Sequence, residues 1–339
     1  PTGRSLINII KGEEIMKKFL AMILAVTMVL SLAACGKSSE AATSGEKREE
    51  ELYSMVVFTK GAEYFNWCYA GMQDAAESIG DFIKVELQGP AEWDASQEAR
   101  AVETVLAKKP NGIVVSCADE STLIPSINKA IESGVPVICF DSDSSESNRL
   151  SYVGTNNNTF GAVAGKAIVD TIGTEGEIAI IMVPGAVSME ERAQGYTVLN
   201  DEGDVAKAEQ VTSALLQSNP NIKAIFSTHG YGAPGAAAAC RTLNMVGDIT
   251  IIGSDYDSAT IELLKSGDIA GTVIDDPYLL GYEAFMLSYA AAHPTDVLSG
   301  NAPFGHVPPL IFGSCSLLTG KVLEDPAAAA RYENPPKIN

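Results

Sequence analysis

The stretch IVVSCADESTLIPSINKAIESGVPVICFDSD, residues 113–143, contains the pattern that decides the fold. Its segments 113–117 and 135–140 are short apolar runs rich in Val and Ile, which is typical of strands buried on both faces. Between them, 123–132 has the apolar spacing of an amphipathic helix. A strand, a helix and a second strand in this order predict a parallel sheet, whose carboxyl edge here ends in Asp141, Ser142 and Asp143.

The same alternation continues on both sides of this unit. Upstream, we expect strands at 53–59 and 82–87 and helices at 64–79 and 96–108. The pattern restarts after Gly154, with strands expected at 177–183, 222–227, 249–253 and 269–274 and helices at 160–172, 190–199, 205–217, 233–243 and 277–292. The predicted fold is α/β, with two doubly wound parallel-sheet lobes joined by a multi-strand hinge. Ligands of such sheets bind at the carboxyl ends of the strands, so one cleft between the lobes is expected.

Composition fits this reading and excludes some functions. The chain has 339 residues, too many for one ordinary core, with 46% hydrophobic and 19% charged residues. A net charge of −20 without a basic stripe argues against a nucleic-acid partner. The five cysteines after Cys35 show no CxxC pairing, and we expect them to be buried small hydrophobic side chains, Cys117 and Cys139 within strands.

The N-terminal segment is typical of a lipoprotein signal peptide. A positive start, Met16-Lys17-Lys18, is followed by the apolar stretch 19–32 and by Leu32-Ala33-Ala34-Cys35, which resembles a lipobox with Cys35 as the lipidated residue. An uncleaved anchor helix is the alternative. We therefore assign 16–35 to the signal peptide and the polar stretch 36–51 to a flexible tether. Residues 1–15 are expected to be a spurious upstream extension, because Lys11–Ile15 back-translates to a purine-rich stretch resembling a ribosome-binding site.

Polar and aromatic side chains gather after the predicted strands. Aromatic rings can stack on the C–H faces of a sugar, carboxylates accept hydroxyl protons, and arginine donates hydrogen bonds as a fork. The candidate ligand-binding residues are Lys60, Tyr64, Phe65, Asp141, Asp143, Arg192, His229, Tyr231, Asp255 and Asp275. Core packing remains open for the two aromatic residues after the first strand, helix capping for Asp141 and Asp255, and a surface position for Arg192. Trp93 is expected to serve packing.

Other classes of function have no support in the sequence. Neither a dinucleotide or phosphate-binding glycine loop nor a nucleophile elbow occurs, and the three histidines lack metal-ligand spacing, so we expect no catalytic residue, metal site or cofactor. A transcription regulator would need an N-terminal helix-turn-helix where the signal peptide stands. A ligand-binding sensor that docks on a membrane receptor remains an alternative.

Five segments, 89–116, 127–157, 190–196, 203–228 and 251–282, carry a family resemblance. Together they resemble the type I periplasmic binding proteins of the ribose-binding class over nearly all of residues 52–300. The resemblance implies an extracytoplasmic, lipid-anchored, monomeric sugar-binding component of an ABC importer, which closes on its ligand by a hinge and delivers it to a permease. It places the family's aromatic pair on Tyr64 and Phe65, and its remaining sugar contacts on Asp141, Arg192 and Asp255.

The resemblance also implies domain boundaries and reveals departures from the family pattern. We expect an N-terminal lobe from 52–155 plus 277–303 and a C-terminal lobe from 156–276 plus 304–334, with crossings near 154–157, 275–276 and 301–306. His229 and Asp275 replace residue types common in the family. The segment 197–203 is much shorter than in the family, so the second lobe is expected to lack one strand, to close the gap by re-registering, or to belong to a damaged gene product.

Overall fold

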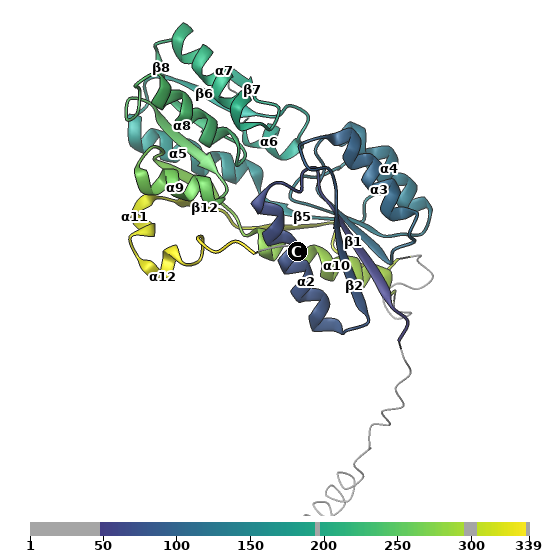
Figure 1. Cartoon of the computed structure of the whole chain (residues 1–339). Helices are drawn as coiled ribbons and strands as arrows, with labels where there is room; N and C mark the ends of the chain where they lie inside the picture. Colours follow the sequence, from purple (N-terminus) through teal and green to yellow (C-terminus); the bar gives the residue numbers. More distant parts are fainter. Residues whose placement is uncertain (1–47, 194–196, 295–303, 337–339) are drawn as a thin grey trace, which may run out of the picture. The chain divides into compact units, whose positions relative to one another are not determined.

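The computed structural model describes residues 48–193, 197–294 and 304–336 (Figure 1). Residues from 50 onward form one compact unit. The expected signal peptide, the lipidation site at Cys35 and most of the tether therefore lie outside the described residues. Within the described ranges, no helix has the length and apolar character needed to cross a membrane.

The first lobe is built on a parallel sheet with the strand order β11-β5-β4-β3-β1-β2. Its strands are β1 (Glu51–Val56), β2 (Ile83–Gln88), β3 (Gly112–Val115), β4 (Val137–Phe140), β5 (Ser151–Thr155) and β11 (Leu310–Gly313). Strands β3 and β4 are buried along their whole length. This burial is what their continuous apolar sequences predict for strands covered on both faces.

Helices cover both faces of this sheet. They are α2 (Glu63–Ile79), α3 (Ala95–Leu106), α4 (Glu120–Glu132) and α10 (Pro277–Ala292). Because successive side chains of a strand point to opposite faces, Met55 packs with α2 and α10 while the next residue, Val56, packs with α3 and α4. The lobe is therefore a three-layer sandwich with two separate apolar cores.

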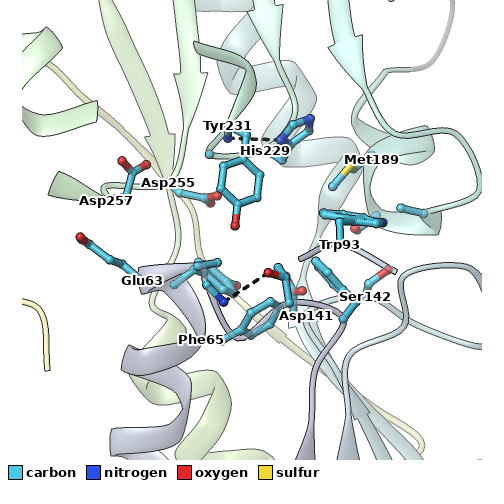
Figure 2. Close-up of a pocket in the computed structure, with 18 of the residues that line it drawn as sticks. Glu63, Phe65, Trp93, Asp141, Ser142, Met189, His229, Tyr231, Asp255 and Asp257 are labelled. Atoms are coloured by element: carbon cyan, nitrogen blue, oxygen red, sulfur yellow. Dashed lines mark hydrogen bonds between the residues drawn. The ribbon is translucent and has the colours of Figure 1, made fainter. Parts of the chain in front are cut away.

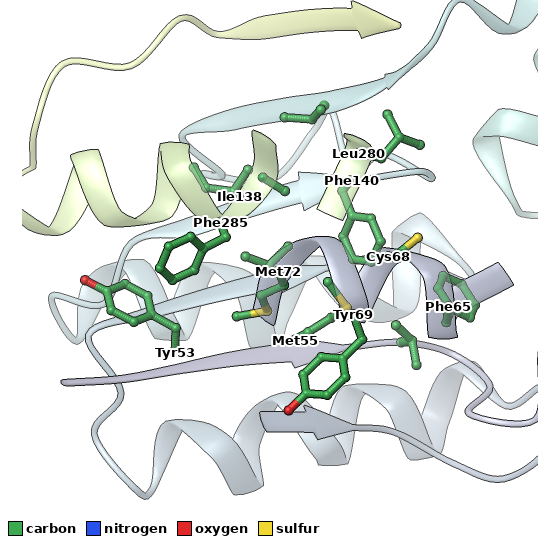
Figure 3. Close-up of a cluster of buried hydrophobic side chains, with 14 of the residues drawn as sticks. Tyr53, Met55, Phe65, Cys68, Tyr69, Met72, Ile138, Phe140, Leu280 and Phe285 are labelled. Carbon is green, nitrogen blue, oxygen red and sulfur yellow. The ribbon is translucent and has the colours of Figure 1, made fainter. Parts of the chain in front are cut away.

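The core under α2 and α10 is the more aromatic of the two (Figure 3). The rings of Tyr53 and Phe285 meet edge to face with centroids 5.2 Å apart, and Met72 is fully buried beside them. Helices α2 and α10 approach closely at two glycines. A Cβ on Gly71 would collide with the carbonyl of Tyr278, and one on Gly281 would collide with the carbonyl of Cys68. The close helix packing therefore requires glycine at both positions.

The second lobe repeats this plan with the strand order β12-β10-β9-β8-β6-β7. Its strands are β6 (Glu177–Met182), β7 (Thr197–Asn200), β8 (Ile222–Ser227), β9 (Thr250–Ser254), β10 (Gly271–Ile274) and β12 (Ser316–Leu318). All pairs are parallel except β10 with β12. Its helices are α5 (Asn157–Ile172), α6 (Val187–Arg192), α7 (Val205–Ser218), α8 (Gly232–Thr242), α9 (Ser258–Ser266), α11 (Gly320–Leu323) and α12 (Pro326–Ala329).

The expectation that the second lobe lacks a strand is wrong. Strand β7 pairs in parallel with β6 from Ala179–Thr197 to Met182–Asn200, so each lobe has a six-stranded sheet. The predicted helix 190–199 is also wrong, because α6 ends at Arg192 and β7 begins at Thr197. The 14 residues between β6 and β7 still suffice for a parallel crossover, which needs about a dozen.

The third connection between the lobes also lies elsewhere than expected. Strand β11 pairs with β5 in the first sheet, whereas β12 pairs with β10 in the second. The chain therefore crosses at Ser314–Cys315 rather than at 301–306. The last segment of the second lobe begins after this crossing, later than the expected residue 304. The other described crossings run from β5 into α5 and from β10 into α10, at the expected places.

Candidate ligand-binding site

The carboxyl ends of both sheets border one cavity of about 320 Å³. Its wall on the first lobe includes Phe65, Trp93 and Asp141, and its wall on the second includes His229 and Asp255 (Figure 2). The predicted residues that line it are Tyr64, Phe65, Asp141, Arg192, His229, Tyr231 and Asp255. Side chains from segments almost 200 residues apart therefore meet at one place, as the doubly wound pattern predicts.

Asp141 directly follows β4 and has a left-handed backbone with φ of 59°. Its N–H donates to the Val153 carbonyl (3.0 Å), and its Oδ2 accepts from the Ser116 hydroxyl (2.6 Å). Burial raises the pKa of Asp141 to about 6, although the Ser116 hydrogen bond and the charge of Arg192 oppose the rise. The carboxyl group therefore titrates closer to neutral pH than an ordinary aspartate.

Asp255 has the same role in the second lobe, directly after β9, with φ of 67°. Its N–H donates to the Val273 carbonyl (3.0 Å). Within the described residues, no hydrogen bond reaches its carboxylate. Burial, followed by the negative charge of Asp275, raises the pKa of Asp255 well above its ordinary range.

Arg192, the last residue of α6, is held by neutral partners. Its Nε donates to Asn157 Oδ1 (2.9 Å), its Nη1 donates to the Thr228 carbonyl (2.8 Å), and its Cζ lies 3.9 Å from the centroid of the Phe160 ring. These contacts fix the plane of the guanidinium and leave further N–H groups for a ligand. Arg192 is 8% exposed, so the surface position left open for it is wrong.

Aromatic rings form the apolar part of the wall. Phe58 contacts Phe65 edge to face (4.9 Å between centroids) and Trp93 at a tilt (4.0 Å). Trp93 therefore packs, as expected, and also lines the cavity. The Tyr64 hydroxyl is buried and has no hydrogen-bond partner among the described residues, so a ligand oxygen could satisfy it.

His229 lies between the cavity and a buried carboxylate. Its Nε2 is 3.0 Å from Oδ1 of Asp201, which is fully buried, and the Tyr231 N–H donates to its Nδ1 (3.3 Å). An accepting Nδ1 places the proton on Nε2, which donates it to Asp201. Asp201 directly follows β7, so the shortened segment supplies the partner of a residue that itself departs from the family pattern.

The two lobes also touch around the cavity. The Ser258 N–H and hydroxyl both donate to Glu63 Oε2 (2.9 Å each), and Trp67 meets Tyr256 edge to face (5.9 Å). The described conformation is therefore one in which the lobes are in contact over the site.

Comparison with known proteins places this architecture in a family. A profile of the periplasmic binding protein domain matches residues 53–294. The chain belongs to the periplasmic binding protein family. It is 27% identical over 282 residues to the ribose import binding protein of Bacillus subtilis (strain 168), covering 78% of this chain and 90% of that protein. It is 26% identical over 251 residues to the D-allose-binding periplasmic protein of Escherichia coli (strain K12), covering 68% and 80%.

Solved structures of the family agree with the fold. A sugar-binding protein of a sugar ABC transporter from Bacillus halodurans superposes with a TM-score of 0.71 at 28% identity, covering 80% of this chain and 98% of that one. The arabinose-binding protein of Geobacillus stearothermophilus gives 0.68 at 30% identity, with coverage of 81% and 98%. The two α/β lobes and their mostly parallel sheets are thus those of type I periplasmic binding proteins.

Three predicted residues of this binding protein do not line the cavity. Lys60 is exposed at the surface. Asp143 instead accepts hydrogen bonds from Arg149 Nε and Nη2 (2.5 and 2.6 Å). Asp275 lies behind the wall, where its Oδ2 accepts from the Thr155 hydroxyl (2.7 Å) and its Oδ1 is buried without a partner among the described residues.

The wall also contains residues outside the predicted ligand-binding set. Glu63, Ser142, Met189 and Asp257 all line the cavity. Glu63 and Ser142 are direct neighbours of predicted residues, so adjacency to Tyr64 and Asp141 was an available signal. Asp257 caps α9 through the Thr260 N–H (3.1 Å), and its sequence context reads only as a cap. No group of three or more His, Cys, Asp or Glu within the described ranges is arranged to hold a metal ion.

Proposed function

We propose that this chain is the extracytoplasmic solute-binding component of an ABC importer and that it binds a monosaccharide or related polyol between its lobes. The observation that carries this proposal is the cavity itself, in which aromatic rings, carboxylates and one fixed guanidinium from both lobes surround a space suited to a small ligand. The relatives named as ribose import and D-allose-binding proteins support the same ligand class.

The mechanism is closure about the three crossing segments. A ligand that contacts both Asp141 and Asp255 favours the conformation in which the lobes touch, and the permease recognises that conformation. The protein performs no chemistry on the ligand and acts as a monomer without cofactor or metal. The import roles of the relatives favour this function over a sensory one.

We further propose that Cys35 carries a lipid anchor and that residues 36–51 tether the binding unit to the outer face of the cell membrane. The lipobox-like sequence supports this assignment. Expression with radiolabelled palmitate tests it: the wild-type protein should incorporate label and partition into detergent, and Cys35→Ser should do neither. Label retained in the variant would exclude Cys35 as the anchor.

A melting screen of the purified protein against pentoses, hexoses and inositols tests the binding function. A ligand present at a hundred times its dissociation constant should stabilise the folded state by about 2.7 kcal/mol and raise Tm by a few degrees. Calorimetry should then give one site per chain. A sharp transition that no member of the panel moves would refute the carbohydrate ligand.

A further inference from the structure

The cavity holds more negative than positive groups. The buried Asp275 is close enough to raise the pKa values of both Asp141 and Asp255, and Glu63 and Asp257 add two carboxylates to the wall. Among the described lining residues, Arg192 is the one Lys or Arg side chain. Full ionisation would therefore leave the site with a net negative charge that the protein itself does not neutralise.

Arg192 offsets part of this charge, since it lowers the pKa values of Asp141 and Asp255, but one guanidinium cannot balance several carboxylates. Arg192 donates to the Asn157 amide and the Thr228 carbonyl, and none of the described carboxylates forms an ion pair with it. His229 directs its Nε2 to Asp201 and accepts the Tyr231 N–H at Nδ1. The imidazole therefore presents no proton to the cavity.

Asp255 is the carboxylate most in need of a partner. Asp141 already binds the Ser116 hydroxyl, and Asp257 binds Thr260, whereas no hydrogen bond to the Asp255 carboxylate exists within the described residues. The Oδ2 atoms of Asp255 and Asp257 both approach the same side of Gly230, since a Cβ there would lie 3.1 and 3.2 Å from them. Two carboxylates of the second lobe thus converge at one point of the wall.

A separate observation points to a polar ligand at this site. Ser142 lines the cavity beside Asp141, is 1% exposed, and its hydroxyl has no partner within the described residues. Buried hydroxyls are normally hydrogen-bonded, so Ser142 and the Tyr64 hydroxyl both point to a polar ligand. The rings of Phe65 and Trp93 supply the apolar surface for its carbon skeleton.

A neutral ligand would leave this charge uncompensated. The hydroxyl groups of a neutral sugar can donate hydrogen bonds to the carboxylates but bring no positive charge, so closure over such a sugar requires the protein to take up protons or to bear repulsion between its carboxylates. A cationic ligand removes that cost because it pairs with them directly. We therefore propose that the natural ligand is a protonated amine on a small polyhydroxylated skeleton, such as an amino sugar, with the ammonium group held by Asp255 beside Asp257.

This inference rests on the proposed function and can be tested separately from it. Calorimetry at pH 7 should compare glucose with glucosamine and galactose with galactosamine, with the N-acetyl derivatives as controls that keep the nitrogen but lose the charge. We expect at least one amine to bind about tenfold or more tightly than both its hydroxyl and its N-acetyl counterpart. A neutral sugar that binds as tightly as its amine would overturn the inference and keep the carbohydrate function. Failure of all members to bind would overturn the inference, whereas the carbohydrate function is refuted by a failure of the wider melting screen.

Asp255→Asn identifies the carboxylate responsible. Asparagine tolerates the left-handed backbone at this position, so the fold should be retained. The preference for the amine over the hydroxyl sugar should fall about tenfold or more. Asp170→Asn removes an equal charge from an exposed ion pair with Lys166 and should leave the preference unchanged. A preference that survives Asp255→Asn would show that the charge is recognised elsewhere and would contradict the assignment.

Discussion

Asp141 and Asp255 occupy equivalent positions in the two lobes. Each is the first residue after a strand in the middle of its sheet, with φ of 59° and 67°. Each N–H donates to a carbonyl of the next strand (3.0 Å in both cases). The backbone carbonyl of each aspartate itself accepts a hydrogen bond from a side-chain hydroxyl. The donor is Tyr152 for Asp141 and Thr272 for Asp255 (2.7 Å in both cases).

This pseudo-symmetry explains how two similar units make one site. The left-handed backbone turns each aspartate out of its strand at the carboxyl edge, so that both carboxylates border the same cavity. Alanine at either position would combine the loss of the carboxylate with backbone strain of about 1 kcal/mol, whereas asparagine isolates the charge.

Asp141→Asn should change the pH dependence of stability. The carboxyl of Asp141 has its pKa raised to about 6 in the folded protein, against an ordinary 3.8. The folded state then binds more protons than the unfolded state between these values, so the contribution of Asp141 to stability is lost as pH rises from 4 to above 6. The variant lacks this titration and should gain up to about 3 kcal/mol relative to wild type between pH 4 and 7.5.

Urea unfolding of both proteins at several pH values measures this difference. Carboxylates with lowered pKa values, such as Asp94 and Asp268, are common to both proteins and cancel. A stability difference that stays constant from pH 4 to 7.5 would contradict the raised pKa.

Arg192→Lys should weaken ligand binding at least tenfold while the protein remains folded. Lysine cannot reproduce the planar fork that contacts Asn157 and Thr228 and still donate into the cavity. The dissociation constant of a ligand identified in the melting screen should be measured by calorimetry, with circular dichroism to verify the fold. Arg241→Lys disrupts a comparable fork to Asp268 outside the cavity and serves as the matched control. Equal affinities in the two variants would remove Arg192 from the site.

Much of the fold could be predicted because its strands are buried on both faces. Apolar composition alone predicts strands at 113–117 and 135–140; β4 lies within the second run, and β3 begins one residue before the first. Strand β7 could not be predicted in this way. It is four residues long and lies at a sheet edge, and the helical spacing before it favoured a helix that continued through Gly195, although that glycine is a possible helix stop.

The candidate site was predictable where residues directly follow strands. Asp141 and Asp255 satisfy this rule, and both line the cavity. Asp143 also lies in such a loop, but pairing with Arg149 uses its carboxylate, and nothing in local sequence indicates which partner a loop side chain takes. The contact between His229 and Asp201 depends on two segments 28 residues apart, so only the tertiary structure reveals it.

Gly281→Ala should destabilise the protein by about 2 kcal/mol or more, since the added Cβ would meet the backbone of α2, which cannot move without disturbing the aromatic core. Gly165→Ala provides the contrast. It lies in α5 with open space around its Cβ, so the higher helix propensity of alanine should stabilise the protein by about 0.5–1 kcal/mol. Thermal unfolding of both variants measures the two shifts. A Gly281→Ala protein as stable as wild type would mean that α2 and α10 pack less closely than described.

The intrinsic fluorescence of the protein should report lobe closure. Both tryptophans of the chain belong to the first lobe and contact the second. Trp67 meets Tyr256 edge to face. The Trp93 ring packs so closely on Gly203 that a Cβ added to this glycine would lie 2.8 Å from the ring. Separation of the lobes would expose both indoles to water, so ligand binding should shift the emission to shorter wavelength.

Two variants assign this signal. Trp67→Phe leaves Trp93, which also lines the cavity and responds to the ligand itself, whereas Trp93→Phe leaves Trp67, which does not line the cavity. A ligand-dependent shift in Trp93→Phe therefore measures closure at the rim rather than direct contact. Ser258→Ala removes the hydroxyl hydrogen bond to Glu63 and keeps the one from the N–H, so it should reduce affinity by about two- to fivefold, as expected for one partly exposed hydrogen bond to a charged group. If Trp93→Phe binds ligand with no change in Trp67 emission, the lobes do not move on binding, and closure about the three crossing segments is not how this protein holds its ligand.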